Sequence, residues 1–246
     1  MPLQTNGADH AMKMAVVLFP GFELLDVAAP GELLGAVPEL IRLVYCAQRP
    51  GPVASSCMEL AGGTVGPALV ATHSLQEGGL IAAAADGDGF SPDAILVPGG
   101  KGMRAELSNR WLLQWLSDAA ARADVVFTVC TGSWLLAATG ALDGIPATSN
   151  KNALRAGHPQ NAAPGVLWQL DARWVEHELL SDGDTTFFLT SSGVSAGGDA
   201  ALALIARLGG IEQARRVAHR AEWSWHEDRA VDPFAKEYEL QKPTER

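Results

Sequence analysis

Short runs of mostly apolar residues constrain the fold of this chain more than any other feature. They stand at 14–19, 41–47, 94–97 and 125–129. A strand buried on both faces of a parallel sheet reads as such a run, whereas a strand with one exposed face alternates. Segments 24–37 and 105–122 carry apolar residues at helical spacing. We therefore predict an α/β fold with a doubly wound, mostly parallel sheet and helices on both faces.

Smaller elements are expected in the remaining segments. Gly-Gly and Gly-Pro pairs between short apolar stretches indicate a hairpin, as does the sequence Ser-Asp-Gly-Asp between two apolar segments. The expected elements are a hairpin at 53–72, a surface loop at 82–90, a helix at 134–142, a hairpin of 173–180 with 185–190, and closing helices at 195–208 and 211–225.

The length suits one domain. The chain has 246 residues, of which 48% are hydrophobic and 19% are charged, as in ordinary globular proteins. We expect a single domain at 12–230, with terminal arms at 1–11 and 231–246.

Charge and cysteine usage exclude several classes of function. The net charge of −10 opposes attraction to phosphates, so nucleic acid is not an expected partner. No stretch approaches the about 20 apolar residues of a membrane span, and the first residues lack an apolar signal core, which predicts a cytoplasmic protein without a membrane partner. Cys46, Cys57 and Cys130 form no Cys-x-x-Cys pair. No metal cluster or phosphate loop appears, and we expect neither a metal nor a cofactor.

Three predicted strands lead into residues that could take part in a reaction. Asp26 follows the first strand, Gly99 and Gly100 follow another, and Cys130 stands between a third strand and a helix. Loops and helix N-termini converge at the carboxyl ends of such strands. A thiol at a helix N-terminus faces unpaired N–H groups that favour the thiolate. We therefore predict Cys130 as the nucleophile, with Thr131 and Gly100 as oxyanion-hole donors and glycine permitting close approach of a second backbone.

Each of these residues also has a structural interpretation. A single cysteine after an apolar strand is often a small buried hydrophobic residue, and Asp26 is equally placed to cap a helix. We expect structural roles for Cys46 and Cys57. None of the histidines falls in a motif, and we expect surface or structural roles for all of them. They are His10, His73, His158, His177, His219 and His226.

Three segments match a known pattern. They read Ala-Val-Val-Leu-Phe-Pro-Gly-Phe at 15–22 with Leu-Asp-Val at 25–27, Leu-Val-Pro-Gly-Gly at 96–100, and Val-Cys-Thr-Gly-Ser at 129–133. In this order and spacing they resemble the ThiJ/PfpI superfamily of class I glutamine amidotransferase-like proteins, over roughly residues 14–230. The resemblance implies a flavodoxin-like fold, a nucleophile elbow at Cys130, an acidic partner for the thiol at Asp26, and a homodimer.

Within this superfamily, the Leu-Asp pair and the Cys-Thr-Gly elbow look most like isocyanide hydratase and its relatives. The resemblance implies that Cys130 attacks the isocyanide carbon of a small-molecule substrate, and that water hydrolyses the resulting thioimidate to an N-substituted formamide. Thr131 stands where the protease-like and chaperone-like branches carry histidine, which leaves Asp26 for proton transfer. These hydratases commonly read Ala-Thr-Thr-His-Trp where this chain has Ala-Thr-Ser-Asn-Lys, so Ser149 and Asn150 are expected to reshape the pocket.

Functions of three classes follow from this interpretation. The first is a cysteine-dependent enzyme, a hydro-lyase or hydrolase, with isocyanide hydration ahead of glyoxalase-type hydration of reactive dicarbonyls. The second is a stress sensor, in which Cys130 is oxidised to a sulfinate. The third is the ligand-sensing domain of a transcription regulator. Such regulators carry a helix-turn-helix region after this domain, and the short acidic tail here places this function last.

Overall fold

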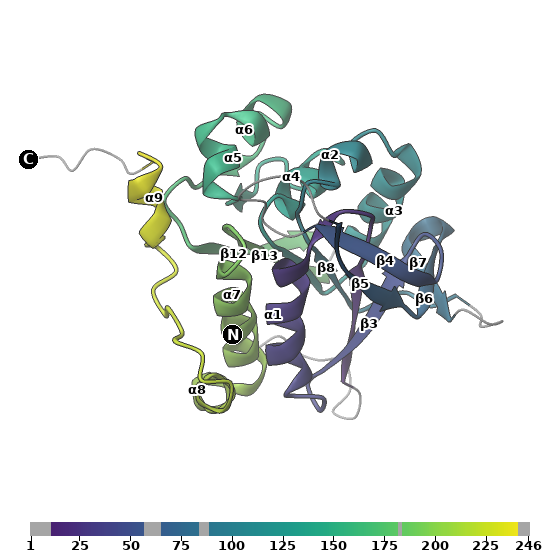
Figure 1. Ribbon diagram of the computed structural model, residues 1–246, viewed down its shortest axis with the longest axis horizontal. Helices are drawn as coiled ribbons and strands as arrows, with labels where there is room; N and C mark the ends of the chain where they lie inside the picture. Colours follow the sequence, from purple (N-terminus) through teal and green to yellow (C-terminus); the bar gives the residue numbers. More distant parts are fainter. Residues whose placement is uncertain (1–10, 57–64, 84–88, 182–183, 241–246) are drawn as a thin grey trace, which may run out of the picture.

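A central sheet of eight strands runs through the protein (Figure 1). The computed structural model describes residues 11–56, 65–83, 89–181 and 184–240. The strands of the sheet are β1 (Met12–Val17), β3 (Ile41–Ala47), β6 (His73–Gln76), β7 (Leu80–Ala83), β8 (Ala94–Val97), β9 (Val125–Thr128), β12 (Trp174–Ser181) and β13 (Asp184–Ser191). Their order across the sheet is β12-β13-β9-β8-β1-β3-β6-β7.

The inner strands are parallel, as the apolar runs predict. β1 pairs in parallel with β3 and β8, and β9 pairs in parallel with β8 and β13. Only the edge strands β7 and β12 are antiparallel to their neighbours. Every residue of β8 and β9 is buried, which explains why neither strand alternates. The predicted flavodoxin-like α/β fold is confirmed.

Helices cover both faces of this sheet. They are α1 (Leu24–Gly35), α2 (Met103–Glu106), α3 (Arg110–Ala120), α4 (Gly132–Ala137), α5 (Lys151–Arg155), α6 (His158–Ala162), α7 (Ala196–Gly209), α8 (Ile211–Arg220) and α9 (Pro233–Glu237), with a 3-10 turn at Glu77–Gly79. The crossovers β1-α1-β3 and β8-α3-β9 move in opposite directions along the sheet. Because such crossovers are right-handed, α1 and α3 lie on opposite faces. α1 and α7 pack side by side (Figure 1). None of these described helices is long and apolar enough to cross a membrane.

Two smaller sheets extend the central one. β2 (Phe22–Glu23), β4 (Gly51–Ser56) and β5 (Val65–Ala71) form one sheet, and β10 (Pro146–Ala147) pairs with β11 (Leu167–Trp168) in the other. The antiparallel pair β4 and β5 confirms the hairpin predicted at 53–72, although Cys57 lies outside the described residues. The antiparallel pair β12 and β13 confirms the second predicted hairpin. The loop predicted at 82–90 is described only in part, and Phe90 pairs with Ile81 there.

Two predicted helices have different bounds in the structure. The helix predicted at 105–122 is divided into α2 and α3, because Asn109 starts a new helix. Its Oδ1 accepts a hydrogen bond from the N–H of Leu112 at 3.2 Å, which caps α3. The helix predicted at 211–225 is shorter and ends with α8, after which Glu222 adopts a positive φ of 50°. In both cases one residue with non-helical backbone interrupts a helical pattern.

The C-terminal residues are attached to the body of the protein. The sequence assigns 231–246 to a terminal arm, and the described part of this arm contains α9 and a buried Asp232. Asp232 caps α9 by accepting a hydrogen bond from the N–H of Phe234 at 2.9 Å. Its own N–H donates to the carbonyl oxygen of Asp171 at 2.8 Å. These residues are therefore packed against the segment that leads into β12.

Replacing Asn109 with alanine is expected to lower the free energy of unfolding by about 1 kcal/mol, because the N–H of Leu112 loses its acceptor. Asn109→Ser keeps an acceptor without placing a negative charge beside Glu106, and is expected to cost less. Urea unfolding followed by circular dichroism measures both variants. Equal losses for alanine and serine would show that the cap does not stabilise the start of α3.

Candidate active site

Cys130 forms the turn between β9 and α4 with a positive φ of 58°. This conformation is costly for any residue with a Cβ atom, so neighbouring groups must hold it. The N–H of Cys130 donates to the carbonyl oxygen of Ser192 at 3.0 Å. Its carbonyl oxygen accepts hydrogen bonds from Ser133 Oγ at 3.1 Å and Ser149 Oγ at 3.0 Å. The predicted elbow is present, and α4 replaces the longer helix expected at 134–142.

The Cys130 thiol is surrounded by hydrogen-bonding groups. The backbone N–H groups of Val194 and Thr131 and the side chain of Asn150 are hydrogen-bonded to the sulfur. The Asp26 carboxyl group lies beside the thiol and interacts with it electrostatically. These groups come from four separate segments of the chain and leave Cys130 only 6% exposed. The thiol is therefore held from several sides in a narrow site.

Asp26 is fully buried in the first turn of α1. Its Oδ2 accepts a hydrogen bond from the N–H of Gly99 at 2.8 Å, and its Oδ1 has no hydrogen-bond partner among the described residues. Burial raises the pKa of the Asp26 carboxyl group well above its usual value, although the Gly99 hydrogen bond opposes this shift, and the charge of Glu23 raises the pKa further. The site therefore favours a protonated Asp26, which can donate as well as accept a proton.

Gly99 and Gly100 bring the loop after β8 into contact with the elbow. A Cβ atom on Gly99 would lie 2.5 Å from the backbone nitrogen of Thr131. Gly100 adopts a φ of 121°, and its N–H donates to Thr131 Oγ1 at 3.2 Å. Of the two predicted oxyanion-hole amides, that of Gly100 is directed at the Thr131 hydroxyl group and that of Thr131 at the sulfur. The structure thus brings these residues together with Asp26 and Cys130.

Burial and hydrogen bonding shift the pKa of the Cys130 thiol in opposite directions. Desolvation raises the pKa of the Cys130 thiol well above its usual value, and the charge of Asp26 raises it further. The N–H groups of Val194 and Thr131 and the side chain of Asn150 lower the pKa without reversing the shift. α4 spans only 6 residues, so its dipole is weak. Burial therefore opposes the thiolate that the sequence predicts, whereas the three hydrogen-bonding groups favour it.

Asn150, Val194 and Glu23 belong to the site, although the sequence marks them weakly or not at all. Asn150 stands out only as a departure from histidine, and its Oδ1 caps α5 by accepting a hydrogen bond from Ala153 N at 3.1 Å. Val194 adopts a positive φ of 27°, which is unusual for a β-branched residue. Glu23 is partly buried, and burial raises the pKa of its carboxyl group. An N-cap signal before α5 could have drawn attention to Asn150, whereas the other two depend on tertiary packing.

Neither Cys46 nor any histidine of the described segments is among the groups that act on the Cys130 thiol. Cys46 is buried in β3, and its thiol donates to a main-chain carbonyl of β1 at 3.4 Å, which agrees with a structural role. Among the described residues, no histidine is in hydrogen-bonding contact with the Cys130 thiol. His158 stacks on Trp134 with ring centroids 5.7 Å apart. Within the described part of the chain, no group of three or more His, Cys, Asp or Glu residues is placed to hold a metal ion.

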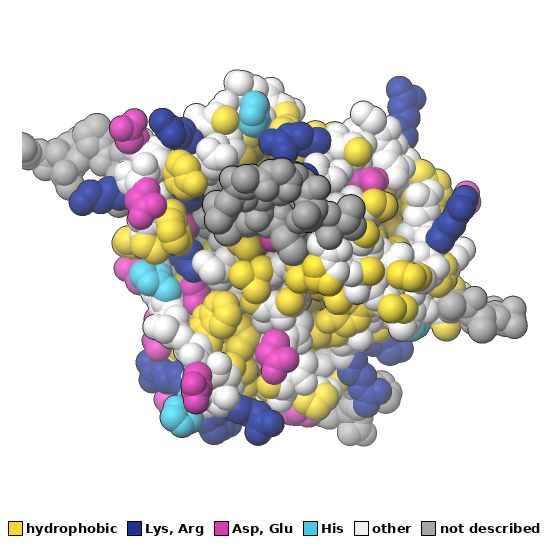
Figure 2. Space-filling view, viewed as in Figure 1, with side chains coloured by type: hydrophobic (Ala, Val, Ile, Leu, Met, Phe, Trp, Pro, Cys, Tyr) yellow, Lys and Arg dark blue, Asp and Glu magenta, His cyan; other side chains and the backbone are white. Residues whose placement is uncertain are grey.

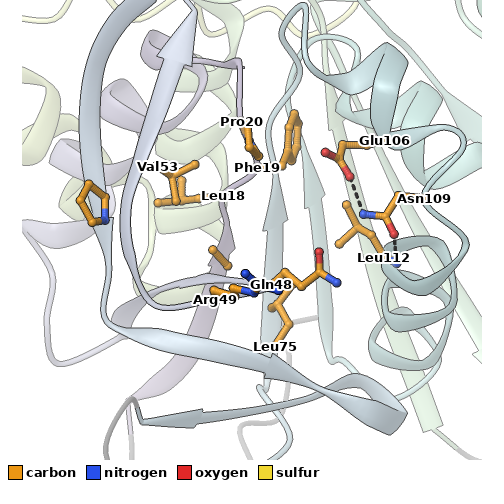
Figure 3. A pocket seen from close by; sticks show the side chains of 12 residues that line it. Leu18, Phe19, Pro20, Gln48, Arg49, Val53, Leu75, Glu106, Asn109 and Leu112 are labelled. Carbon is orange, nitrogen blue, oxygen red and sulfur yellow. Dashed lines mark hydrogen bonds between the residues drawn. The ribbon is translucent and has the colours of Figure 1, made fainter.

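A cavity of about 300 Å³ lies at the carboxyl ends of β1 and β3 (Figure 3). Figure 3 shows Glu106 and Asn109 together on one side of it and Arg49 on another. Its lining residues are Leu18, Phe19, Pro20, Ala47, Gln48, Arg49, Pro52, Val53, Leu75, Glu106, Asn109 and Leu112. None of them is among the groups that are hydrogen-bonded to the Cys130 thiol. The lining of the cavity therefore contains none of the groups that hold the thiol.

A cysteine with positive φ, set between a parallel strand and a helix beside a buried carboxyl group, defines an α/β protein with a nucleophile elbow. Sequence comparison agrees with this class. Residues 12–207 match the sequence model of the DJ-1/PfpI family, and the chain belongs to this family.

Individual relatives support the same assignment. The chain is 29% identical over 215 residues to an isonitrile hydratase of Pseudomonas putida, covering 87% of this chain and 79% of that protein. The crystal structure of a ThiJ/PfpI family protein from Pseudomonas syringae is 26% identical with a TM-score of 0.64, covering 91% of this chain and 82% of that chain. Drosophila melanogaster DJ-1beta shares the fold at 18% identity, with a TM-score of 0.62 over 88% of this chain and all of that chain. The resemblance to the ThiJ/PfpI superfamily is confirmed.

Replacing Asp26 with asparagine is expected to lower the apparent pKa for alkylation of Cys130. An ionised Asp26 opposes a second negative charge on the neighbouring sulfur, and neutral asparagine removes this repulsion. Iodoacetamide labelling across pH, followed by peptide mass spectrometry, distinguishes Cys130 from Cys46 and Cys57. Glu32→Gln, an exposed position of the same helix, is the matched control and is expected to leave the profile nearly unchanged. An unchanged profile in Asp26→Asn would contradict the pairing of thiol and carboxyl group.

Proposed function

We propose that this protein hydrates isonitriles, also called isocyanides, to N-substituted formamides through a covalent intermediate on Cys130. The observation that carries the proposal is the Cys130 thiol at the elbow beside the buried Asp26 carboxyl group, whose pKa burial raises. An isonitrile reacts by adding a nucleophile and a proton to the same terminal carbon atom. A thiol paired with a proton-transferring carboxyl group suits this requirement. The similarity to an isonitrile hydratase over most of the chain supports this substrate class.

In the first step, the sulfur of Cys130 forms a bond to the terminal carbon of the isonitrile. The thiol proton passes to Asp26 as Asp26 delivers its own proton to that carbon, whose lone pair accepts it. The product is a thioimidate, and Asp26 ends the step in its starting protonation state.

In the second step, a water molecule adds to the thioimidate carbon, and one of its protons reaches the nitrogen through Asp26. The carbon–sulfur bond then breaks as the added hydroxyl group becomes the formyl oxygen and gives its proton to the sulfur. The products are the formamide and the free thiol, so the oxygen of the formyl group comes from water.

The groups around the sulfur stabilise it while its proton is absent. The side chain of Asn150 and the N–H groups of Thr131 and Val194 bind the sulfur more strongly as negative charge develops, because charge-assisted hydrogen bonds are stronger than neutral ones. The Thr131 hydroxyl group accepts the N–H of Gly100, which leaves its own proton free for the substrate nitrogen. We therefore propose Cys130, Asp26 and Thr131 as the catalytic residues, with Asn150 as an additional donor.

The burial of the thiol argues against the sensor function. Oxidation by peroxide requires an accessible thiolate. Cys130 is 6% exposed, and burial raises the pKa of its thiol, so both requirements are poorly met. A narrow site in which burial opposes the thiolate suits a slender, uncharged electrophile better.

Cys130→Ala is expected to abolish formamide production from benzyl isocyanide, because the thioimidate cannot form. Asp26→Asn is expected to reduce kcat by about 10²-fold or more through loss of proton transfer. Liquid chromatography with mass spectrometry measures the formamide, and water labelled with oxygen-18 must appear in its formyl group. Cys46→Ser serves as the control and is expected to retain activity.

The same protein samples are incubated with glyoxal and methylglyoxal. Loss of dicarbonyl that depends on Cys130, without any formamide from the isonitrile, would replace isonitrile hydration by the glyoxalase-type reaction. An active Cys130→Ala variant would overturn both assignments.

We further propose that the protein is a cytoplasmic homodimer. Cys46 and Cys130 are free thiols, which suits a reducing compartment. Leu25 on α1 is 42% exposed and Val70 on β5 is 60% exposed. Figure 2 shows apolar side chains gathered on the face that carries α1 and α7. An exposed apolar area of this kind suits a self-complementary contact between two copies.

Leu25→Glu is expected to shift the dimer towards monomer, because a carboxylate would enter the apolar contact. Size-exclusion chromatography with light scattering measures the mass. Leu180→Glu changes a more exposed leucine, 74% exposed, on the edge strand β12 and is expected to leave the mass unchanged. A monomeric wild-type protein would refute the dimer.

A further inference from the structure

Four charged side chains are buried together beside the candidate active site. Lys151, Arg173, Asp199 and Asp232, here called the buried charge cluster, are exposed by 2%, 5%, 2% and 1% respectively. Arg173 donates to Asp199 Oδ2 through Nε at 2.9 Å and through Nη2 at 2.7 Å. Asp232 lies between the two cations, 3.9 Å from Lys151 Nζ and 3.8 Å from Arg173 Nη1. Buried ion pairs add little stability compared with apolar packing, so their value lies in fixing geometry.

Lys151 connects the cluster to the thiol through its neighbour in the chain. Asn150, whose side chain is hydrogen-bonded to the sulfur of Cys130, directly precedes it. Lys151 Nζ donates to Thr148 Oγ1 at 3.0 Å and to the carbonyl oxygen of Ala172 at 2.5 Å. The ammonium group therefore joins the segment that carries Asn150, through Thr148 and Lys151, to the backbone at Ala172.

Arg173 connects the cluster to the opposite side of the thiol. Its carbonyl oxygen accepts the N–H of Ser192 at 2.9 Å, and the carbonyl oxygen of Ser192 in turn accepts the N–H of Cys130 at 3.0 Å. Nη2 of Arg173 also donates to Ser195 Oγ at 3.1 Å. Ser195 follows Val194, whose N–H is hydrogen-bonded to the sulfur. Both cations of the cluster thus lie next to groups that hold the reactive residue.

The acidic members attach a distant part of the chain to this arrangement. Asp199 Oδ1 accepts hydrogen bonds from Trp223 Nε1 at 2.9 Å and from the N–H of His226 at 3.2 Å. The N–H of Asp232 donates to the carbonyl oxygen of Asp171 at 2.8 Å. The segment from Trp223 to Asp232 therefore completes the cluster, far along the sequence from the elbow.

We propose that Asp232 is a positioning residue for the thiol: its charge holds Lys151, and through Lys151 the side chain of Asn150, against Cys130. The inference rests on the proposed function only in taking Cys130 as the reacting group, and its effect on the thiol needs no substrate.

Electrostatics at Lys151 support this role. Burial lowers the pKa of Lys151 to about 8, while the charges of Asp232 and Asp171 raise it and that of Arg173 lowers it. The ammonium form in this site therefore depends on Asp232. Asp232 Oδ2 and Arg173 Nη1 have no hydrogen-bond partner among the described residues, so Asp232 acts on both cations mainly through its charge.

Asp232→Asn separates positioning from a direct effect of charge on the thiol. Loss of a nearby negative charge by itself favours the thiolate and would speed alkylation of Cys130. Loss of position removes the Asn150 donor and slows alkylation, and we expect at least fivefold slowing with iodoacetamide at pH 8. A rate equal to or above that of the wild type would overturn the proposal.

A second comparison tests whether the effect passes through Asn150. Asn150→Ser keeps an acceptor for the N-cap of α5 but has no amide that reaches the sulfur. In this background, Asp232→Asn is expected to slow alkylation by less than twofold, because the interaction that Asp232 positions is already absent. A full fivefold slowing in this background would overturn the proposal.

The double variant Lys151→Met/Asp232→Leu tests whether slower alkylation reflects lost positioning or only a misfolded protein. Apolar side chains of similar volume replace the ion pair, so the protein is expected to fold while alkylation remains slow. A folded double variant with the wild-type rate would overturn the proposal. Ile205→Val, a core change in α7, is the control and is expected to lower the melting temperature without changing the rate.

Steady-state kinetics separate this inference from the proposed function. With benzyl isocyanide, Asp232→Asn is expected to lower kcat at least fivefold with little change in KM, as expected for a thiol out of position. If the wild-type protein forms no formamide and the alkylation rates still follow the expected pattern, the proposed function fails and the positioning role of Asp232 is supported.

Discussion

The close approach of two strand-end loops is the constraint on which the candidate active site depends. A Cβ atom on Gly132 would lie 2.1 Å from the carbonyl oxygen of Val97, and one on Gly99 would lie 2.5 Å from Thr131 N. Because β8 and β9 are neighbouring parallel strands, their ends are already side by side, and glycine lets the following loops touch. In the same contact the N–H of Gly99 donates to Asp26, and this hydrogen bond holds the start of α1 near the thiol. The pairing of β8 with β9 therefore sets the spacing between the thiol and the carboxyl group.

Two opposing effects act on this pair, and burial is the stronger. Donors from the elbow favour a charged sulfur, whereas removal of water raises the pKa of both Cys130 and Asp26. The pair therefore forms a site in which burial opposes negative charge on either group. It suits a reaction in which nucleophile and proton are added to one atom.

Much of the fold could be predicted because the strands are buried. The run at 94–97 coincides with β8, because a strand buried on both faces has no polar interruption, and the run at 41–47 coincides with β3, in which only Arg42 is charged. Asp26, Gly99 and Cys130 were found for the same reason, because each follows one of these strands. The helix break at Asn109 was missed because a side-chain cap is hidden within a helical pattern. Local sequence therefore predicts which residues stand at the strand ends.

The effect of burial on the pKa of Cys130, and the roles of Glu23 and Val194, could not be predicted from the strand pattern. A helix N-terminus is visible in the sequence, but the loss of water around Cys130 depends on segments that lie far from it in the chain. Glu23 and Val194 stand in no motif, and the part played by Val194 arises from a backbone conformation that only the folded loop imposes. What the sequence lacks is the dielectric environment, which tertiary packing creates.

The buried charge cluster has a consequence for the order in which the protein can fold. During synthesis Lys151 and Arg173 are joined to the chain before Asp199, and Asp232 is joined last. A partly made chain that had already packed its elbow would bury two cations without their anions, which costs far more than leaving them in water. The charges therefore oppose early closure around Cys130 and couple the reactive loop to a segment made long after it. The surroundings of the Cys130 thiol are in this way completed only after the whole cluster has been synthesised.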